Sequence, residues 1–155
     1  GICMDGRTSG AVVYENMETS VPGIFACGNV VHVHDLVDYV SAESERAGAA
    51  AAAYVQAAQP AVGGAVLEVK NGAGVSYTVP QHVRAGAQKA EVFFRVNRVL
   101  GASRIIVKDG TGAQIAQYRR EHMAPGEMEH IVLPAVLLQK AQGALTLHAQ
   151  EVAQA

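Results

Sequence analysis

Charged side chains are scarce in this sequence, and that scarcity narrows the classes of protein it can represent. They make up 17% of the 155 residues, against about 25% in typical soluble domains. A surface so poor in charge indicates that part of it is normally covered. The formal net charge is only −2 and no run of Lys or Arg occurs. These features argue against a nucleic-acid-binding protein.

Cysteines and long apolar runs are also few. Cys3 and Cys27 are too few for a disulfide framework and do not form a Cys-x-x-Cys motif. We interpret Cys27 as a small packed residue; a redox thiol is the alternative. No apolar run is long enough to cross a bilayer and no signal peptide is visible. We therefore expect a cytoplasmic protein without membrane contact.

The most informative stretch is Thr19–Val30, with the sequence TSVPGIFACGNV. Its Val21-Pro22-Gly23 segment predicts a turn, because Pro presets φ and Gly tolerates positive φ. The continuous apolar run Ile24–Cys27 predicts a short strand that is buried on both faces. Gly28 and Asn29 follow at its carboxyl end, where open α/β sheets bind ligands.

This stretch resembles the second flavin-binding motif of the FAD-dependent pyridine nucleotide-disulfide oxidoreductases, T-S-x-P-G-[IV]-[FY]-A-x-G-D. Residues 10–18 resemble the β-ribbon that precedes this motif, and residues 38–59 resemble the last helix of the FAD domain. The resemblance implies that residues 1–59 are a partial α/β, Rossmann-like FAD-binding segment. The family usually has Asp at the position of Asn29, so the ribityl hydrogen bond here would be a neutral one.

The resemblance also implies which residues contact the cofactor FAD. Those expected at the ribityl-phosphate chain are Gly28, Asn29 and Val30, and those expected at the flavin ring are Tyr39, Val40 and Ser41. The Gly-x-Gly-x-x-Gly turn that binds the FAD pyrophosphate does not occur. We therefore expect a C-terminal part of an FAD-dependent, NAD(P)H-linked oxidoreductase.

This interpretation implies that the chain binds the remainder of the flavoprotein or a redox partner subunit. We also expect the protein to be a homo-oligomer. The alternative is a non-catalytic β-sandwich module whose helical arm docks on a redox partner.

His32 and His34 form a His-x-His pair that invites a metal interpretation. A metal site needs three or four ligands, and no second His/Cys cluster stands nearby in the sequence. We therefore predict that both histidines bond backbone groups or flank a cofactor. A helix is predicted over residues 41–59, with Glu43 and Glu45 near its positive end.

Residues 60–64 mark a change in composition and are interpreted as a linker. The remainder, residues 65–155, is rich in strand patterns separated by turn signals. The expected strands are 65–69, 75–79, 91–97, 104–108, 114–118, 128–133 and 145–150. Asn71–Gly74 and Asp109–Gly112 predict hairpin turns. The fold class is thus α+β in two parts, a partial FAD-binding segment and an immunoglobulin-like β-sandwich that serves for docking or dimerisation.

Overall fold

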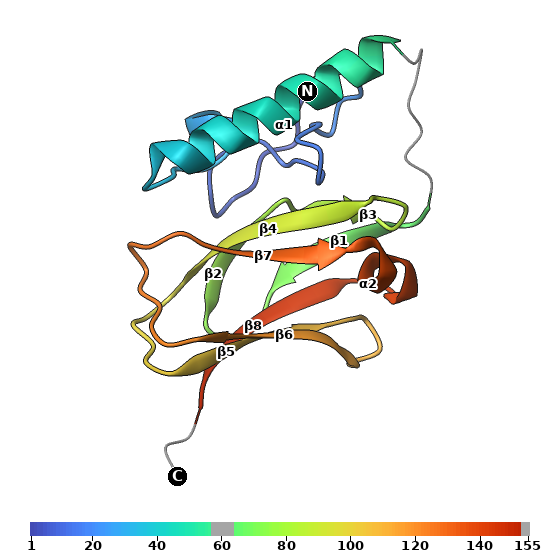
Figure 1. The fold of residues 1–155 in the computed structure, drawn as a ribbon. Helices are drawn as coiled ribbons and strands as arrows, with labels where there is room; N and C mark the ends of the chain where they lie inside the picture. Colours follow the sequence, from blue (N-terminus) through green and yellow to red (C-terminus); the bar gives the residue numbers. More distant parts are fainter. Residues whose placement is uncertain (57–63, 153–155) are drawn as a thin grey trace.

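The computed structural model describes residues 1–56 and 64–152 and shows an α+β protein with two helices and two β-sheets. Residues 1–56, here called the N-terminal unit, lie on one face of the three-stranded sheet (Figure 1). Part of the five-stranded sheet lies on the opposite face (Figure 1), while its residues 82–84 contact the N-terminal unit. The α+β class predicted from the sequence is therefore confirmed. Among the described residues, no helix has the length and apolar character needed to span a membrane.

The N-terminal unit holds little regular structure before its helix. Isolated bridges join Met4 to Ala11, Val13 to Thr19 and Glu18 to Phe25. A 3₁₀ turn, η1, spans Gly28–Val30, and helix α1 spans Val37–Gln56. The predicted helix is confirmed from residue 41 to 56 and begins four residues earlier than expected. Its last three predicted residues, and most of the predicted linker, lie outside the described residues.

The doubly buried strand predicted at Ile24–Cys27 is wrong. Only Phe25 forms a bridge, and Ile24 is 44% exposed. A parallel strand needs neighbours on both sides and cover on both faces. In the described part of the chain, this run pairs on one side only, with residues 17–19 through the bridge from Glu18 to Phe25 and two backbone hydrogen bonds.

Helix α1 has one inward-facing side. Ala is the best helix former, so the run from Ala49 to Ala53 favours the helix without deciding its orientation. Glu43 and Ala47, four residues apart, are its buried residues. The opposite, Ala-rich side of the helix is mostly exposed.

The β part consists of eight strands and a short helix. The strands are β1 (Val66–Asn71), β2 (Val75–Val79), β3 (His82–Arg84), β4 (Lys89–Val96), β5 (Ser103–Lys108), β6 (Gln114–Arg120), β7 (Glu129–Pro134) and β8 (Leu145–Glu151). Helix α2 spans Ala135–Lys140. One sheet has the order β3-β1-β8-β5-β6 and the other the order β2-β4-β7. All seven predicted strands are present, whereas β3 and α2 were not predicted.

The main core lies between the two sheets. Alternation places Ile105 and Val107 of β5, and Leu145 and Leu147 of β8, on the inner face. Across the core, β4 contributes Val92, Phe94 and Val96. All of these side chains are at most 1% exposed, so the inner faces of both sheets are fully covered.

Of the two predicted hairpins, one is confirmed and one is wrong. Asp109–Gly112 joins the antiparallel strands β5 and β6. Asn71–Gly74 instead passes the chain from one sheet to the other, because β1 pairs with β3 and β8 while β2 pairs with β4. The glycines there serve close packing: a Cβ on Gly72 would lie 2.6 Å from the Leu147 carbonyl oxygen.

A second, smaller core joins the N-terminal unit to the β part. Its buried members from the N-terminal unit are Ala11, Val13, Met17, Val31 and Ala47, and Val79 of β2 completes it. Phe93 of β4 is also 1% exposed although its neighbour Phe94 points into the main core. The three-stranded sheet is therefore covered on both faces.

Candidate functional site

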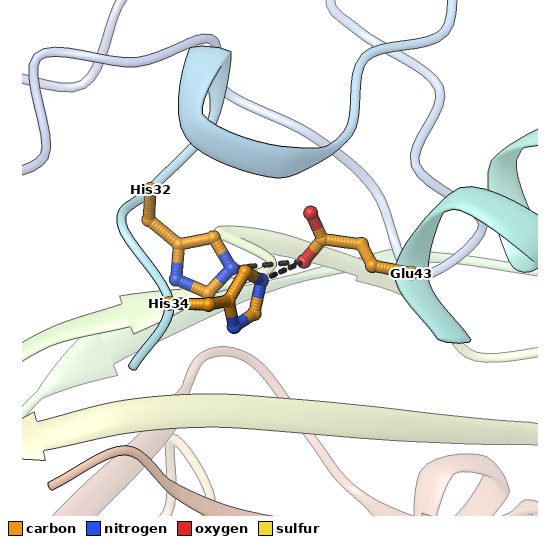
Figure 2. Close-up of side chains that lie close together, drawn as sticks. All are labelled: His32, His34 and Glu43. Carbon is orange, nitrogen blue, oxygen red and sulfur yellow. Dashed lines mark hydrogen bonds and ion pairs between the residues drawn. The ribbon is translucent and has the colours of Figure 1, made fainter. Parts of the chain in front are cut away.

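Three side chains of the N-terminal unit converge at one buried point (Figure 2). The Nε2 atoms of His32 and His34 lie 2.8 and 3.1 Å from Oε2 of Glu43. The potential ligand atoms of these residues all lie within 4.8 Å of one another. The three side chains are at most 1% exposed. We call these residues the His–His–Glu cluster.

The local backbone explains how the cluster forms. Gly28 has a φ of +70°, a conformation that favours glycine, and it opens the 3₁₀ turn that precedes His32. The Gly28 N–H donates a 2.6 Å hydrogen bond to Oε1 of Glu43. Because Glu43 lies on the inner side of α1, this bond fixes the turn against the helix. Both oxygens of the buried carboxylate therefore have partners.

The surroundings of the buried Glu43 favour its ionised form. Burial alone would raise the pKa of Glu43, but hydrogen bonds from His32 and Gly28 and the charges of His32 and His34 outweigh it and lower that pKa. Burial, then the neighbouring His32, lowers the pKa of His34 against the opposing effect of Glu43. The favoured state is thus a carboxylate beside at least one neutral imidazole.

Aromatic rings surround the two imidazoles. Phe93 lies edge-on to both, with ring centroids 5.9 Å from His32 and 5.5 Å from His34. Tyr39 and Tyr77 flank them at about 6 Å. Nδ1 of each histidine is buried without a hydrogen-bond partner in the described part of the chain. The cluster is therefore held mainly through Nε2 and the carboxylate.

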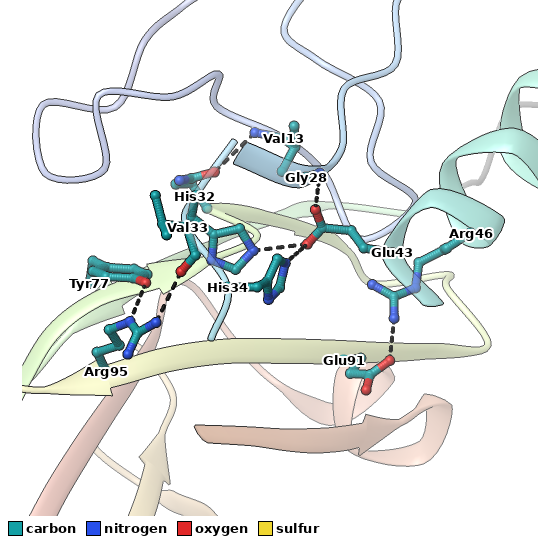
Figure 3. A network of polar contacts seen from close by, with 11 residues as sticks. Val13, Gly28, His32, Val33, His34, Glu43, Arg46, Tyr77, Glu91 and Arg95 are labelled. Atoms are coloured by element: carbon teal, nitrogen blue, oxygen red, sulfur yellow. Dashed lines mark hydrogen bonds and ion pairs between the residues drawn. The ribbon is translucent and has the colours of Figure 1, made fainter. Parts of the chain in front are cut away.

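Two arginines connect β4 to the loop after η1 and to α1 (Figure 3). Arg95 donates to the Val33 carbonyl oxygen at 3.0 Å and to the Tyr77 hydroxyl at 3.1 Å. Arg46 of α1 forms an ion pair with Glu91. These contacts lie on either side of the His–His–Glu cluster and hold the loop and the helix on the same sheet.

The structure brings together parts of both predicted flavin-contact segments. A Cβ placed on Gly28 would lie 3.7 Å from Cγ1 of Val40. Tyr39 and Val40 are partly buried in the first turn of α1. Asn29, Val30 and Ser41 are exposed.

The contact of Glu43 with both histidines was not predicted from the sequence. Glu43 was expected only near the positive end of the helix, and no third ligand was found for a metal site at the His-x-His pair. The spacing of 9 and 11 residues to the histidines follows no local helix or strand period. It is produced by the turn at Gly28 and the direction in which α1 leaves the loop.

Comparisons of the chain with protein-family models, with curated proteins and with solved structures found no match.

Proposed function

We propose that this chain is the C-terminal part of an FAD-dependent, NAD(P)H-linked oxidoreductase and supplies part of its flavin site. The observation that carries the proposal is the proximity of Gly28 to Val40, since a Cβ on Gly28 would lie 3.7 Å from Cγ1 of Val40. These residues belong to two separate segments that the family resemblance assigns to FAD.

The surroundings of Gly28 are compatible with the close approach of a ligand. Among the described residues, and apart from the chain neighbours of Gly28, Val40 is the one residue that a Cβ there would meet within 4 Å, although Gly28 itself is buried. Asn29 and Ser41 have exposed side chains that can donate and accept hydrogen bonds. We assign Asn29 to a ribityl hydroxyl, with Gly28 and Val30 beside the same chain. Tyr39, Val40 and Ser41 are assigned to the ring.

The start of α1 adds an electrostatic contribution. The first N–H groups of a helix lack intrahelical partners and carry partial positive charge. In the proposed site they stabilise negative charge at the nearby edge of a reduced flavin. FAD itself supplies the hydride chemistry with NAD(P)H, while the residues of this chain orient it.

Exposed apolar side chains support a covering partner. Ile24, Val30, Val33, Leu36 and Val37 are 44–79% exposed and come from the segments around η1 and the start of α1. Exposed apolar residues that gather in one region usually mark an interface. We assign this region to the remainder of the flavoprotein and the intact protein to a homo-oligomer. Two free cysteines support a reducing, cytoplasmic location.

The alternative is a non-catalytic module that docks on a redox partner. The β part supports it, because we interpret its two facing sheets as an immunoglobulin-like sandwich suited to docking. The parallel pairing of β1 with β8 and the helix α2 depart from that pattern. This module would retain its structure and bind its partner without flavin.

The test compares flavin retention in the complete reading frame and in this chain. Absorbance of bound FAD is measured after gel filtration of the full protein, its Asn29→Ala variant and a matched control, Asn97→Ala in the β part. We expect Asn29→Ala to retain less FAD than the wild type and the control to retain as much. The isolated chain should bind little, because a hydrogen bond of about 0.5–1.5 kcal/mol and a helix end of at most about 2 kcal/mol do not offset the cost of association.

Two results would contradict the proposal. One is a complete reading frame that encodes no Gly-x-Gly-x-x-Gly segment upstream of residue 1. The other is a full protein that retains FAD equally in the wild type and in a Gly28→Val variant, whose added side chain would fill the space assigned to the cofactor.

A further inference from the structure

We propose that His32, His34 and Glu43 form a binding site for one divalent transition-metal ion of the Zn²⁺ type. The site lies in the N-terminal unit and does not depend on flavin binding. Two imidazole nitrogens and one carboxylate oxygen are the donor set of many sites that keep a further coordination position for water. The three atoms already converge without an ion between them.

The distances suit a metal after a small adjustment. Zn–N and Zn–O bonds of about 2.0–2.2 Å place ligand atoms about 3 Å apart in octahedral and about 3.4 Å apart in tetrahedral coordination. The separations from Glu43 Oε2 are 2.8 Å to His32 and 3.1 Å to His34. The two contacts with Glu43 therefore lengthen by about 0.6 Å or less to reach these separations.

Charge favours a cation at this point. The Glu43 side chain is 0% exposed, and among the described residues neither Lys nor Arg forms an ion pair with it. Buried charges in proteins are paired or coordinate metals. Arg46 and Arg95 are engaged elsewhere, Arg46 with Glu91 and Arg95 with Val33 and Tyr77. A divalent ion would place a permanent positive charge beside the carboxylate, which neutral imidazoles do not provide.

The imidazoles can present the required lone pairs. Ligation through Nε2 requires the proton to reside on Nδ1. In the ion-free state each Nε2 lies within hydrogen-bond distance of Glu43 Oε2, a contact that places the proton on Nε2, so that proton moves to Nδ1 when an ion binds. Neither Nδ1 has a hydrogen-bond partner in the described part of the chain that would prevent this change of tautomer. The Glu43 orientation is fixed separately by the Gly28 N–H. Metal binding therefore exchanges two N–H···O hydrogen bonds for three coordination bonds.

The donor types and the surroundings define the class of ion. Imidazole ligands suit Zn²⁺, Fe²⁺, Co²⁺ and Ni²⁺, whereas Mg²⁺ and Ca²⁺ prefer oxygen ligands. The aromatic rings of Phe93 and Tyr39 cover the cluster. His32 also lines a cavity of about 310 Å³, which brings solvent close to the site. Three protein ligands then leave room for one water.

The test is a Zn²⁺ titration of the metal-free chain against a chromophoric chelator at pH 7.5. We compare the wild type with His34→Gln and Glu43→Gln, and with His122→Gln as the matched control. His122 is an exposed histidine of the β part that stands 3.7 Å from Glu127. We expect one Zn²⁺ per chain in the wild type and the control. Each cluster variant should bind at least about tenfold more weakly.

A second measurement removes the dependence on variant folding. Co²⁺ is added to the wild-type chain, and its visible spectrum reports nitrogen and oxygen coordination. Imidazole ¹⁵N shifts of His32 and His34 should change to the metal-bound pattern on addition of Zn²⁺, while those of His122 should not. Mg²⁺ should change neither signal. Circular dichroism verifies that each variant is folded.

The proposal is overturned if the wild type binds less than one Zn²⁺ per chain. It is also overturned if folded His34→Gln and Glu43→Gln variants bind Zn²⁺ as tightly as His122→Gln does. Neither result would bear on flavin retention by the full protein, so failure of the metal site and failure of the flavin proposal are distinguishable.

Discussion

The Gly28 N–H donates a 2.6 Å hydrogen bond to the buried carboxylate of Glu43, 15 residues further along the chain. This bond joins the 3₁₀ turn to the inner side of α1. The same carboxylate accepts from both histidines. One side chain thus orders the turn at Gly28–Val30, which holds three of the six predicted flavin-contact residues.

Removing that carboxylate should destabilise the protein strongly. Glu43→Ala leaves the Gly28 N–H and two imidazoles without their acceptor, and we expect a loss of about 3 kcal/mol or more in the free energy of unfolding. Glu43→Gln retains an acceptor oxygen and should lose about half as much. Urea unfolding in the presence of a chelator measures both. Glu45→Ala, an exposed change on the same helix, should stay within about 0.5 kcal/mol of the wild type.

Two glycines of the N-terminal unit should respond differently to alanine. In Gly28→Ala the new methyl group makes only an ordinary contact with Val40, but the alanine has to adopt a φ of +70°. This backbone conformation should lower the free energy of unfolding by about 1–2 kcal/mol. Gly10→Ala would place its Cβ directly on the Val31 backbone, so the loop has to move. Thermal unfolding should show a modest loss for the first and a much larger loss for the second. Equal losses would contradict this packing.

Arg84 should couple the N-terminal unit energetically to β3. Its guanidinium lies 3.0 Å from Glu15 and 2.5 Å from Glu18. A double-mutant cycle of Arg84→Ala and Glu15→Ala, followed by urea unfolding, should give a coupling of about 1–3 kcal/mol. The exposed pair Lys70–Glu68 is the control and should couple by less than about 0.5 kcal/mol. A similar small value for Arg84 and Glu15 would refute the prediction.

Adjacent phenylalanines of β4 should serve different parts of the protein. Phe94 lies in the core between the sheets, and Phe94→Ala should lower the stability of the whole chain by about 3–5 kcal/mol. Phe93 contacts His34 and Tyr39, so Phe93→Ala should loosen the N-terminal unit first. Limited proteolysis with mass spectrometry would then detect early cleavage within residues 1–56. Early cleavage in the β strands instead would contradict this division.

The turn between β5 and β6 should contribute a pH-dependent stability. Hydrogen bonds from Thr111, opposed by burial and aided by the Gln142 N–H, lower the pKa of Asp109. A carboxylate with a lowered folded-state pKa stabilises above its unfolded pKa and loses that effect as the pH falls below it. The stability difference between wild type and Asp109→Asn should be constant from pH 7 to about 5 and shrink below about pH 4. A difference that stays constant into acid would be inconsistent with this.

Most strands of the β part could be predicted, because each is marked by a pattern of a few neighbouring residues. Alternation in β5 and β8 and the Asp109–Gly112 turn are read within a few residues. Sheet assignment was less predictable, since Gly72 and Gly74 serve close packing against β8 rather than a hairpin. The short β3 has only three residues, one of them buried, which gives no periodic signal.

The N-terminal unit could be predicted only in part because its order depends on distant residues. The helix is evident from its Ala-rich composition, but the strand expected at Ile24–Cys27 required sheet neighbours that the described residues do not provide. Glu43 meets the histidines only through a turn and a change of direction. No sequence period encodes that meeting.

The small core that residues 11–47 share with Val79 can form only after Val79 has been synthesised. A ribosome delivers the N-terminal unit first, yet its partners in β2, β3 and β4 follow later; the Glu15–Arg84 contact, for example, spans 69 residues. Contacts this far apart in sequence form slowly. Until those strands are synthesised, the inner side of helix α1 stays exposed to solvent. In that state it can associate with other chains or with chaperones.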